Sequence, residues 1–254
     1  MLVDYHVHVV AHGEYHYREE WLNQYLDRAQ QRGVQAIGLV EHDQFKERID
    51  WRLIEALKRT DLHIAAGLEI DFVPGREESI KRMIDQHPLD FVMGSVHFIN
   101  DWAFDHPDHR AGFDALDIDQ VYSDYYVLID KLVKSRLFDI IGHLDLIKIW
   151  GHRPIKKDSL QHVQPILHSI KASPMVIEIN SAGLRKPVQE MYPCRQIIEK
   201  MFQLGLPVTM GSDAHHPDQV AEGLADVSRT LWSIGYRKVI AFKGRESYPL
   251  PLAL

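Results

Sequence analysis

Histidines are concentrated at the start of this 254-residue chain, where four of them fall within eleven residues. The stretch MLVDYHVHVVAHGEYH contains His6, His8, His12 and His16. In a β-strand, residues two positions apart point to the same side, so His6 and His8 can hold one cation together. Histidine is the commonest metal ligand and the usual acid or base near neutral pH. These imidazoles therefore either coat a solvated surface or converge on a cation.

Acids and histidines also follow the later apolar runs of the sequence. They are Glu41, His42 and Asp43, then Glu69 and Asp71, His97, His143 and Asp145, Glu178 and Asn180, and Asp213 with His215. Histidine and carboxylate ligands without thiolate suit Zn, Mn or Fe. A cluster of such ions lowers the pKa of bound water and clamps phosphoryl oxygens. Any one of these histidines alone would be read as a surface residue, but their recurrence predicts metal-dependent phosphoester chemistry.

The elements that must position these residues alternate between short apolar runs and longer segments with helical periodicity. The predicted strands are Leu2–Val10, Ala36–Val40, His63–Leu68, Phe91–Val96, Ile140–Leu146, Met175–Ile179 and Pro207–Met210, with Lys238–Phe242 as an eighth candidate. The predicted helices are Glu19–Arg32, Ile49–Lys58, Glu77–Asp85, Asp119–Lys134, Ser159–Lys171, Cys194–Leu204 and Val220–Ile234. Seven or eight strand–helix units favour a closed α/β barrel. All strand carboxyl ends of such a barrel open on one rim, where the predicted ligands would meet.

Composition excludes several other classes of protein. The formal net charge of −7 argues against long duplex nucleic acid as the main partner, because such binding rests on phosphate neutralisation by Lys and Arg. Cys194 is the single cysteine, which rules out an intrachain disulfide and cysteine-rich zinc modules. We find neither a membrane-length apolar stretch nor a secretory signal, so the expected location is the cytoplasm. The sequence leaves the oligomeric state open, a homo-oligomer included.

The order of the motifs resembles one known family. D-x-H-x-H, then E-H, a carboxylate, two separate histidines and a final D-x-H are similar to the PHP (polymerase and histidinol phosphatase) superfamily over nearly the whole chain. The segments GSVHFINDWAFDHP, IGHLDLIK and EINSAGLRKPVQEMYP resemble its histidinol-phosphatase branch. This resemblance implies a distorted (β/α)7 TIM-like barrel, a single PHP-type phosphoesterase domain over residues 1–254, and two to three divalent ions.

The resemblance also implies three groups of metal ligands. They are His6, His8, Glu69 and Asp213 for the first ion, Glu69, His97 and His143 for the second, and His12, His42 and His215 for the third. His16 competes with His12, because the loop after the first motif is shorter here than in the family. The family often has T-D-H where this chain has Val40-Glu41-His42, so we expect Glu41 to support a ligand by accepting a hydrogen bond. Asp4 is expected to support His6 or to act as a simple hydrogen-bond acceptor.

The reaction implied by the resemblance is the hydrolysis of L-histidinol phosphate to L-histidinol and phosphate, a step of histidine biosynthesis. A hydroxide that bridges the metals would attack phosphorus, and Arg185 would bind phosphate through its planar fork. Asp213 and His215 are the two candidates for protonating the leaving alkoxide. The rim-loop residues Asp101, Trp102 and Asp105 are the expected substrate contacts, with an acid there pairing with the substrate's ammonium group.

Two other functions remain at this stage. The same metals can serve a phosphoesterase acting on a nucleotide, an oligonucleotide end, a sugar phosphate or phosphotyrosine. A non-catalytic, metal-dependent binding module is the other alternative. Against it, no expected ligand position carries an inert residue.

Overall fold

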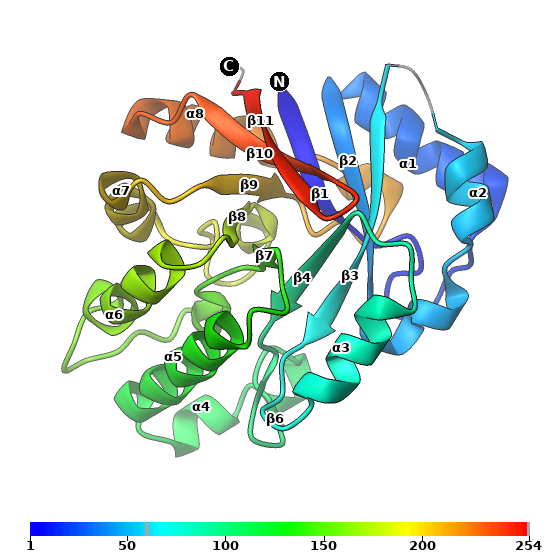
Figure 1. The fold of residues 1–254 in the computed structure, drawn as a ribbon. Coiled ribbons are helices and arrows are strands. Elements are labelled where there is room, and N and C mark those ends of the chain that lie inside the picture. The colour runs from blue at the N-terminus through cyan, green and yellow to red at the C-terminus, as the bar shows by residue number, and fades with distance from the viewer. Residues whose placement is uncertain (59–60, 253–254) are drawn as a thin grey trace.

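Seven parallel strands form the centre of the protein (Figure 1). The computed structural model describes residues 1–58 and 61–252. In spatial order the strands are β1 (Leu2–Val7), β2 (Val34–His42), β3 (His63–Asp71), β4 (Phe91–Ser95), β7 (Ile140–Ile141), β8 (Val176–Asn180) and β9 (Val208–Gly211). Just beyond the first and last strands, His8 N donates to Ala214 O at 2.8 Å and Ala214 N donates to His6 O at 3.1 Å. The sheet therefore nearly closes, which confirms the predicted seven-stranded α/β barrel.

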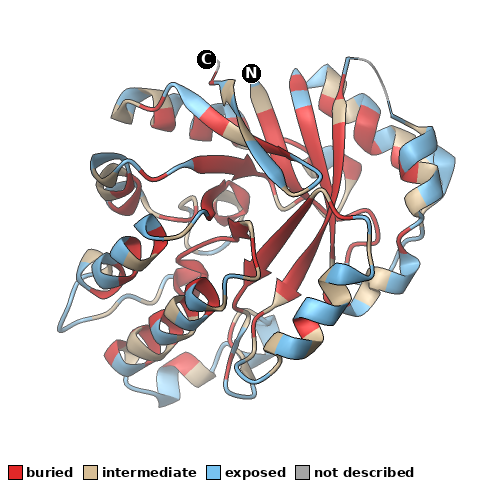
Figure 2. Ribbon diagram, in the orientation of Figure 1, coloured by how far each residue is buried: buried red, intermediate tan, exposed pale blue. Residues whose placement is uncertain are grey.

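Helices cover the outer face of this barrel (Figure 2). They are α1 (Glu19–Gln31), α2 (Trp51–Ala56), α3 (Glu77–Asp85), α5 (Ile118–Ser135), α6 (Ser159–Lys171), α7 (Arg195–Leu204) and α8 (Leu224–Ile234). α1 buries Leu22, Tyr25, Leu26 and Ala29, which recur at the spacing of one helical face. α6 begins with a reciprocal capping box, which satisfies backbone groups at its first turn. Two of the predicted helices, α3 and α6, have the bounds expected from the sequence.

A hairpin covers the amino end of the barrel. The eighth candidate run forms β10 (Lys238–Lys243), which pairs antiparallel with β11 (Glu246–Pro251) and does not join the barrel sheet. The Tyr5 hydroxyl accepts a hydrogen bond from Phe242 N at 2.8 Å, and the ring of Tyr5 packs edge-on against Phe91 at 5.2 Å and Phe242 at 5.8 Å. These aromatic rings fill the barrel beneath the predicted site.

Short strands and helices lie at the carboxyl end of the barrel. The insertion between β4 and α5 contains β5 (Phe98–Ile99), β6 (Trp102–Ala103), the 3-10 helix η2 (Pro107–His109) and α4 (Gly112–Ala115). Four more 3-10 helices follow strands β2, β7, β8 and β9: η1 (Asp43–Arg48), η3 (Leu146–Lys148), η4 (Ala182–Arg185) and η5 (Pro217–Gln219). Over residues 1–58 and 61–252, we find no helix long and apolar enough to cross a membrane.

Candidate metal centre

The two histidines of the first motif face two carboxylates, one from β3 and one from the loop after β9. His6 Nε2 lies 3.0 Å from His8 Nε2, 3.4 Å from Glu69 Oε2 and 3.6 Å from Asp213 Oδ1. His8 Nε2 lies 3.4 Å and 3.7 Å from the same two carboxylate oxygens. Asp213 follows β9 in the left-handed region, with φ 53°, a conformation that a non-glycine residue keeps only where its surroundings impose it. The structure thus brings together the residues expected around the first ion.

The second predicted group lies on the other side of Glu69. His143 Nε2 is 3.0 Å from Glu69 Oε1, and His97 Nε2 is 3.7 Å from the same oxygen. The two imidazole nitrogens are 3.3 Å apart. Since Glu69 Oε2 faces the first group and Oε1 faces the second, the carboxylate is placed as a bridge between two ions requires.

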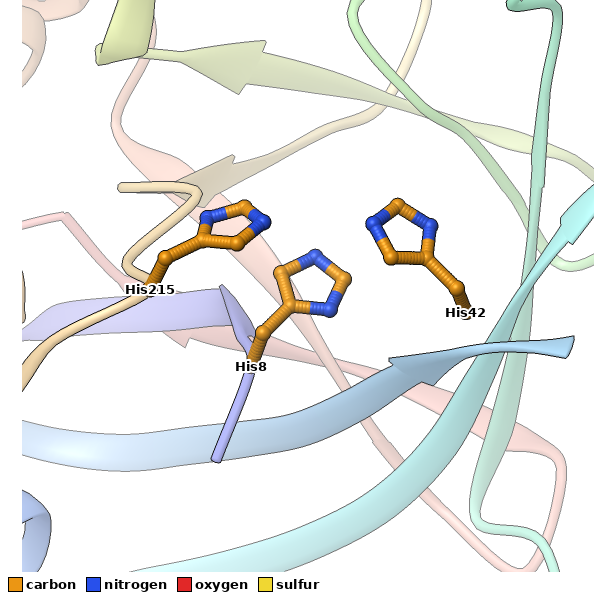
Figure 3. Close-up of side chains that lie close together, drawn as sticks. All are labelled: His8, His42 and His215. Carbon is orange, nitrogen blue, oxygen red and sulfur yellow. The ribbon is translucent and has the colours of Figure 1, made fainter. Parts of the chain in front are cut away.

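The third group differs from the prediction in one member. Ring nitrogens of His8, His42 and His215 lie within 4.8 Å of one another, and Figure 3 shows the three side chains gathered from the segment just after β1, from the end of β2 and from the loop after β9. The His12 side chain is 67% exposed and stacks on His215, with the ring centroids 4.3 Å apart. His16 is exposed and lines a separate hollow beside Tyr17. The His12 ring also stacks on His42, with centroids 6.1 Å apart, so His12 lies at the outer edge of this group and its role as a ligand stays a prediction.

The tautomers of two histidines can be inferred from their partners. His6 Nδ1 lies 2.7 Å from Glu178 Oε1, and His97 Nδ1 contacts Asp71 Oδ1. A carboxylate on Nδ1 favours the proton there and leaves the lone pair of Nε2 facing the centre. The Nε2 lone pairs then face one another and the oxygens of Glu69. Such a donor set can be reconciled only by protons or cations, so it fits divalent metal ions.

The pKa shifts of the clustered histidines and carboxylates also show that these groups interact strongly. Burial opposes charge on His6, but nearby carboxylates, Glu178 first, outweigh it and raise its pKa well above the ordinary histidine value. The carboxylate beside His97 likewise outweighs burial and raises its pKa. Burial acts to raise the pKa of Glu69 and Asp213, yet the surrounding histidines hold both pKa values well below the ordinary range. Protons at His6 and His97 would therefore compete with metal binding.

Residues outside the predicted ligand set hold this centre in place. Glu178 is fully buried and also accepts from His143 N at 2.8 Å through Oε2. Ser95 donates to Glu69 Oε1 at 2.6 Å. The sequence predicts Glu178 and Asp71 at strand ends, but its pattern assigns them no role. An acid in the middle of the apolar run MVIEIN was the available signal for Glu178, whereas nothing in the sequence marks Ser95.

Asp4 and Glu41 support the site by different routes. The Asp4 carboxylate accepts from Ser212 N, Ser212 Oγ and Ala221 N, so it anchors the loop that carries Asp213 and does not reach the His6 ring. Of its two predicted roles, the structure favours that of a hydrogen-bond acceptor. Glu41 Oε1 accepts from Val9 N and Val10 N, just after β1, and Oε2 lies 3.8 Å from His8 Nδ1.

The predicted substrate contacts occupy different places. Arg185 Nη2 donates to Ser212 O at 2.9 Å, which holds the guanidinium beside the loop after β9. Trp102 packs on Phe113, with ring centroids 4.8 Å apart, and donates to His109 O, so it serves the packing of the insertion. Asp101 and Trp102 line a hollow of about 650 Å³ against α5. That hollow contains no member of the three groups, and substrate contact by these two residues stays a prediction. Burial lowers the pKa of His97, but nearby carboxylates, Asp71 first, outweigh it, and half-buried Asp105 is near enough to add to that rise.

A nearly closed α/β barrel whose carboxyl rim gathers histidines and carboxylates belongs to the class of barrels that bind divalent metals. The family follows from a direct comparison of sequence. The profile of the PHP domain matches residues 4–182, and the chain belongs to this family.

Similar proteins carry consistent names. A "Probable histidinol-phosphatase" of Deinococcus radiodurans is 36% identical over 188 residues, which cover 74% of this chain and 71% of the relative. The "Histidinol-phosphatase" of Bacillus subtilis is 25% identical over 260 residues, covering 85% and 94%. The crystal structure of histidinol phosphate phosphatase from Lactococcus lactis, complexed with Zn, L-histidinol and phosphate, is 20% identical with a TM-score of 0.80, covering 97% of this chain and 98% of that one. At 20% identity, the similarity to the Lactococcus lactis structure shows the fold alone.

Proposed function

We propose that this chain is a metal-dependent phosphomonoester hydrolase that converts L-histidinol phosphate to L-histidinol and phosphate. The observation that carries the proposal is the position of Glu69, whose Oε2 lies 3.4 Å from His6 Nε2 while its Oε1 lies 3.0 Å from His143 Nε2. The names of its relatives support the substrate. We also propose that residues 1–254 act as one phosphoesterase domain. The family match ends at 182, but β9 closes the barrel beyond it and brings Asp213 and His215 to the site.

The proposed cofactors are two to three divalent ions, either Zn, Mn or Fe. Bound at this rim, such ions lower the pKa of water and offset the charge of phosphoryl oxygens. The residues proposed to hold them are His6, His8, Glu69, Asp213, His97, His143, His42 and His215, with His12 at the edge of the third group. Glu178 and Asp71 would keep the ring nitrogens of His6 and His97 turned toward the ions.

Proton movement is assigned to Asp213. His215 Nδ1 lies 3.1 Å from the backbone oxygen of Asp213, so Nδ1 carries the proton and Nε2 faces the centre as a ligand atom. Burial lowers the pKa of His215 to about 4, so His215 has no second proton to give near neutral pH. Asp213 is ionised, and its second oxygen can accept the proton lost by the attacking water. The same oxygen then returns that proton to the leaving alkoxide.

Substrate binding is assigned to Arg185 and Asp105. The Nη1 atom of Arg185 is buried and has no hydrogen-bond partner among the described residues, so it is the part of the fork that remains for phosphate. Asp105 is proposed to pair with the ammonium group, because its carboxylate is the predicted rim acid that acts on His97.

The experiment is phosphate release from L-histidinol phosphate, p-nitrophenyl phosphate and a nucleoside monophosphate by enzyme reconstituted with Mn or Zn. We expect a strong preference for histidinol phosphate. Asp105→Asn should lose that preference, while Asp101→Asn, the matched control on the outer hollow, should retain it. Equal turnover of all three substrates would still support a metal-dependent phosphoesterase but would contradict the assignment of histidinol phosphate as its substrate. Metal binding without turnover of any of these substrates would favour the alternative of a non-catalytic, metal-dependent binding module.

A further inference from the structure

The segment after β8 places an unassigned tyrosine against the metal centre. Tyr192 N donates to Asn180 O at 2.9 Å, and Asn180 N donates to Tyr192 O at 2.6 Å. Asn180 is the last residue of β8, two positions beyond Glu178. The edge of the Tyr192 ring faces His143, with centroids 6.5 Å apart and planes at 80°. Tyr192 therefore stands beside one of the proposed ligands of the second ion.

The ring of Tyr192 is held in a single orientation. A Cβ atom at Gly183 would lie 3.0 Å from Cε2 and Cζ of the ring and 1.9 Å from the backbone oxygen of Glu190, so only glycine allows this packing. The Nζ of Lys148 lies 5.4 Å from the ring centroid. Lys148 is itself buried and fixed by Asp145 at 2.9 Å and by the Met191 carbonyl at 2.8 Å. Such a clamp fixes the direction of the hydroxyl.

The Tyr192 hydroxyl makes no hydrogen bond with the described residues of the fold. Tyr192 is 1% exposed, and its Oη has no hydrogen-bond partner anywhere in the described part of the chain. Buried hydroxyls are normally paired, because leaving one unpaired costs free energy. A phenolic hydroxyl keeps its proton near neutral pH, so the group is a neutral hydrogen-bond donor there.

We propose that the Tyr192 hydroxyl donates a hydrogen bond to a phosphoryl oxygen of the substrate, beside His143. This inference rests on the proposed phosphomonoester chemistry and adds a binding residue to it. A neutral donor suits a site already lined by Glu69 and Asp213, because it binds an anion without protonating it. The ammonium end of the substrate has Asp105, which leaves the phosphoryl group as the acceptor that Tyr192 can serve.

The test compares Tyr192→Phe with Tyr126→Phe. Tyr126 on α5 is a matched control, because its hydroxyl is also buried and unpaired among the described residues, and its ring contacts Tyr122, Tyr125 and His162 instead of the centre. Neither change removes a hydrogen bond from the fold, so the melting temperature and the zinc content should stay at wild-type values in both. The readout is calorimetric binding of inorganic phosphate to the zinc-loaded protein, with kcat/KM as a second measurement.

We expect Tyr192→Phe to weaken phosphate binding and to lower kcat/KM, each by roughly 10- to 100-fold, as for the loss of a hydrogen bond to a charged group. Tyr126→Phe should change neither. Phosphate binding by Tyr192→Phe at wild-type strength, or an equal loss in both variants, would overturn the inference. Phosphate binding does not depend on which ester is hydrolysed, so failure of the substrate assignment would be recognised separately.

Discussion

Replacing Glu178 by Gln tests how the barrel orients its metal ligands. The change keeps the shape of the side chain but removes its charge and one acceptor oxygen. In the native structure Oε1 contacts His6 Nδ1 at 2.7 Å and Oε2 accepts from His143 N at 2.8 Å. A glutamine amide can serve only one of these donors. Its NH2 group must then face either His6 Nδ1, moving the ring proton to Nε2, or the amide of His143.

The magnitude follows from the lost charged hydrogen bond. Such bonds contribute about 1.5–3 kcal/mol, and loss of a partner behind a metal ligand typically costs about 10- to 100-fold in metal affinity. Both contacts of Glu178 are fully buried, so solvent does not screen them. We therefore expect Glu178→Gln to bind the first zinc about 10- to 100-fold more weakly.

The assay is zinc affinity by competition with a chelator, with urea unfolding in parallel. Asp139→Asn is the matched control, since Asp139 accepts from Val92 N at 2.8 Å and pairs with Arg245 at the opposite end of the barrel. The control should lose stability and keep its zinc affinity. Zinc binding within twofold of wild type in Glu178→Gln would refute the claim that this carboxylate orients the ligands.

Three further changes test other parts of the account. Gly211→Ala should abolish metal binding or folding, seen by metal analysis and circular dichroism, because its Cβ would lie 2.0 Å from Glu178 Oε1. His42→Ala should lower the metal content of the third group, whereas exposed His12→Ala should not; the reverse result would restore the original prediction. Burial raises the pKa of Glu41 from 4.5 to about 7, so the folded state holds this proton more tightly than the unfolded chain. Stability of the chelator-treated protein should then fall as pH rises from about 4.5 through about 7, and Glu41→Gln should flatten that fall in urea unfolding at pH 5 and 8; equal slopes would contradict it.

Much of the fold was predictable because hydrophobic periodicity carries it. The helices α3 and α6 and most barrel strands follow directly from that pattern. The fifth run, Ile140–Leu146, was wrong in extent, since β7 covers only Ile140–Ile141. The chain turns at His143, with φ 20°, and continues as a 3-10 helix held by the Asp145–Lys148 pair. An apolar run does not reveal such a turn, because its cause lies in contacts from other segments.

The candidate metal centre was also predictable only in part. The i, i+2 spacing of His6 and His8 and the recurrence of ligands at strand ends were sufficient to predict which residues meet. The sequence did not reveal that His8 also lies beside His42 and His215, because ring direction depends on how the barrel closes. It also did not separate Trp102, which packs within the insertion, from acids on the same loop. In an irregular loop the side chains do not alternate with a regular period, so the sequence does not predict the direction in which each one points.

Anomalous diffraction from zinc-loaded crystals, recorded at the zinc edge, tests the central claim most directly. We expect one peak among His6, His8, Glu69 and Asp213 and a second among Glu69, His97 and His143, with zinc–nitrogen distances of about 2.0–2.1 Å. A third peak among His8, His42 and His215 would set the number of ions at three. Zinc found only at exposed histidines, with the strand-end cluster empty, would contradict the account.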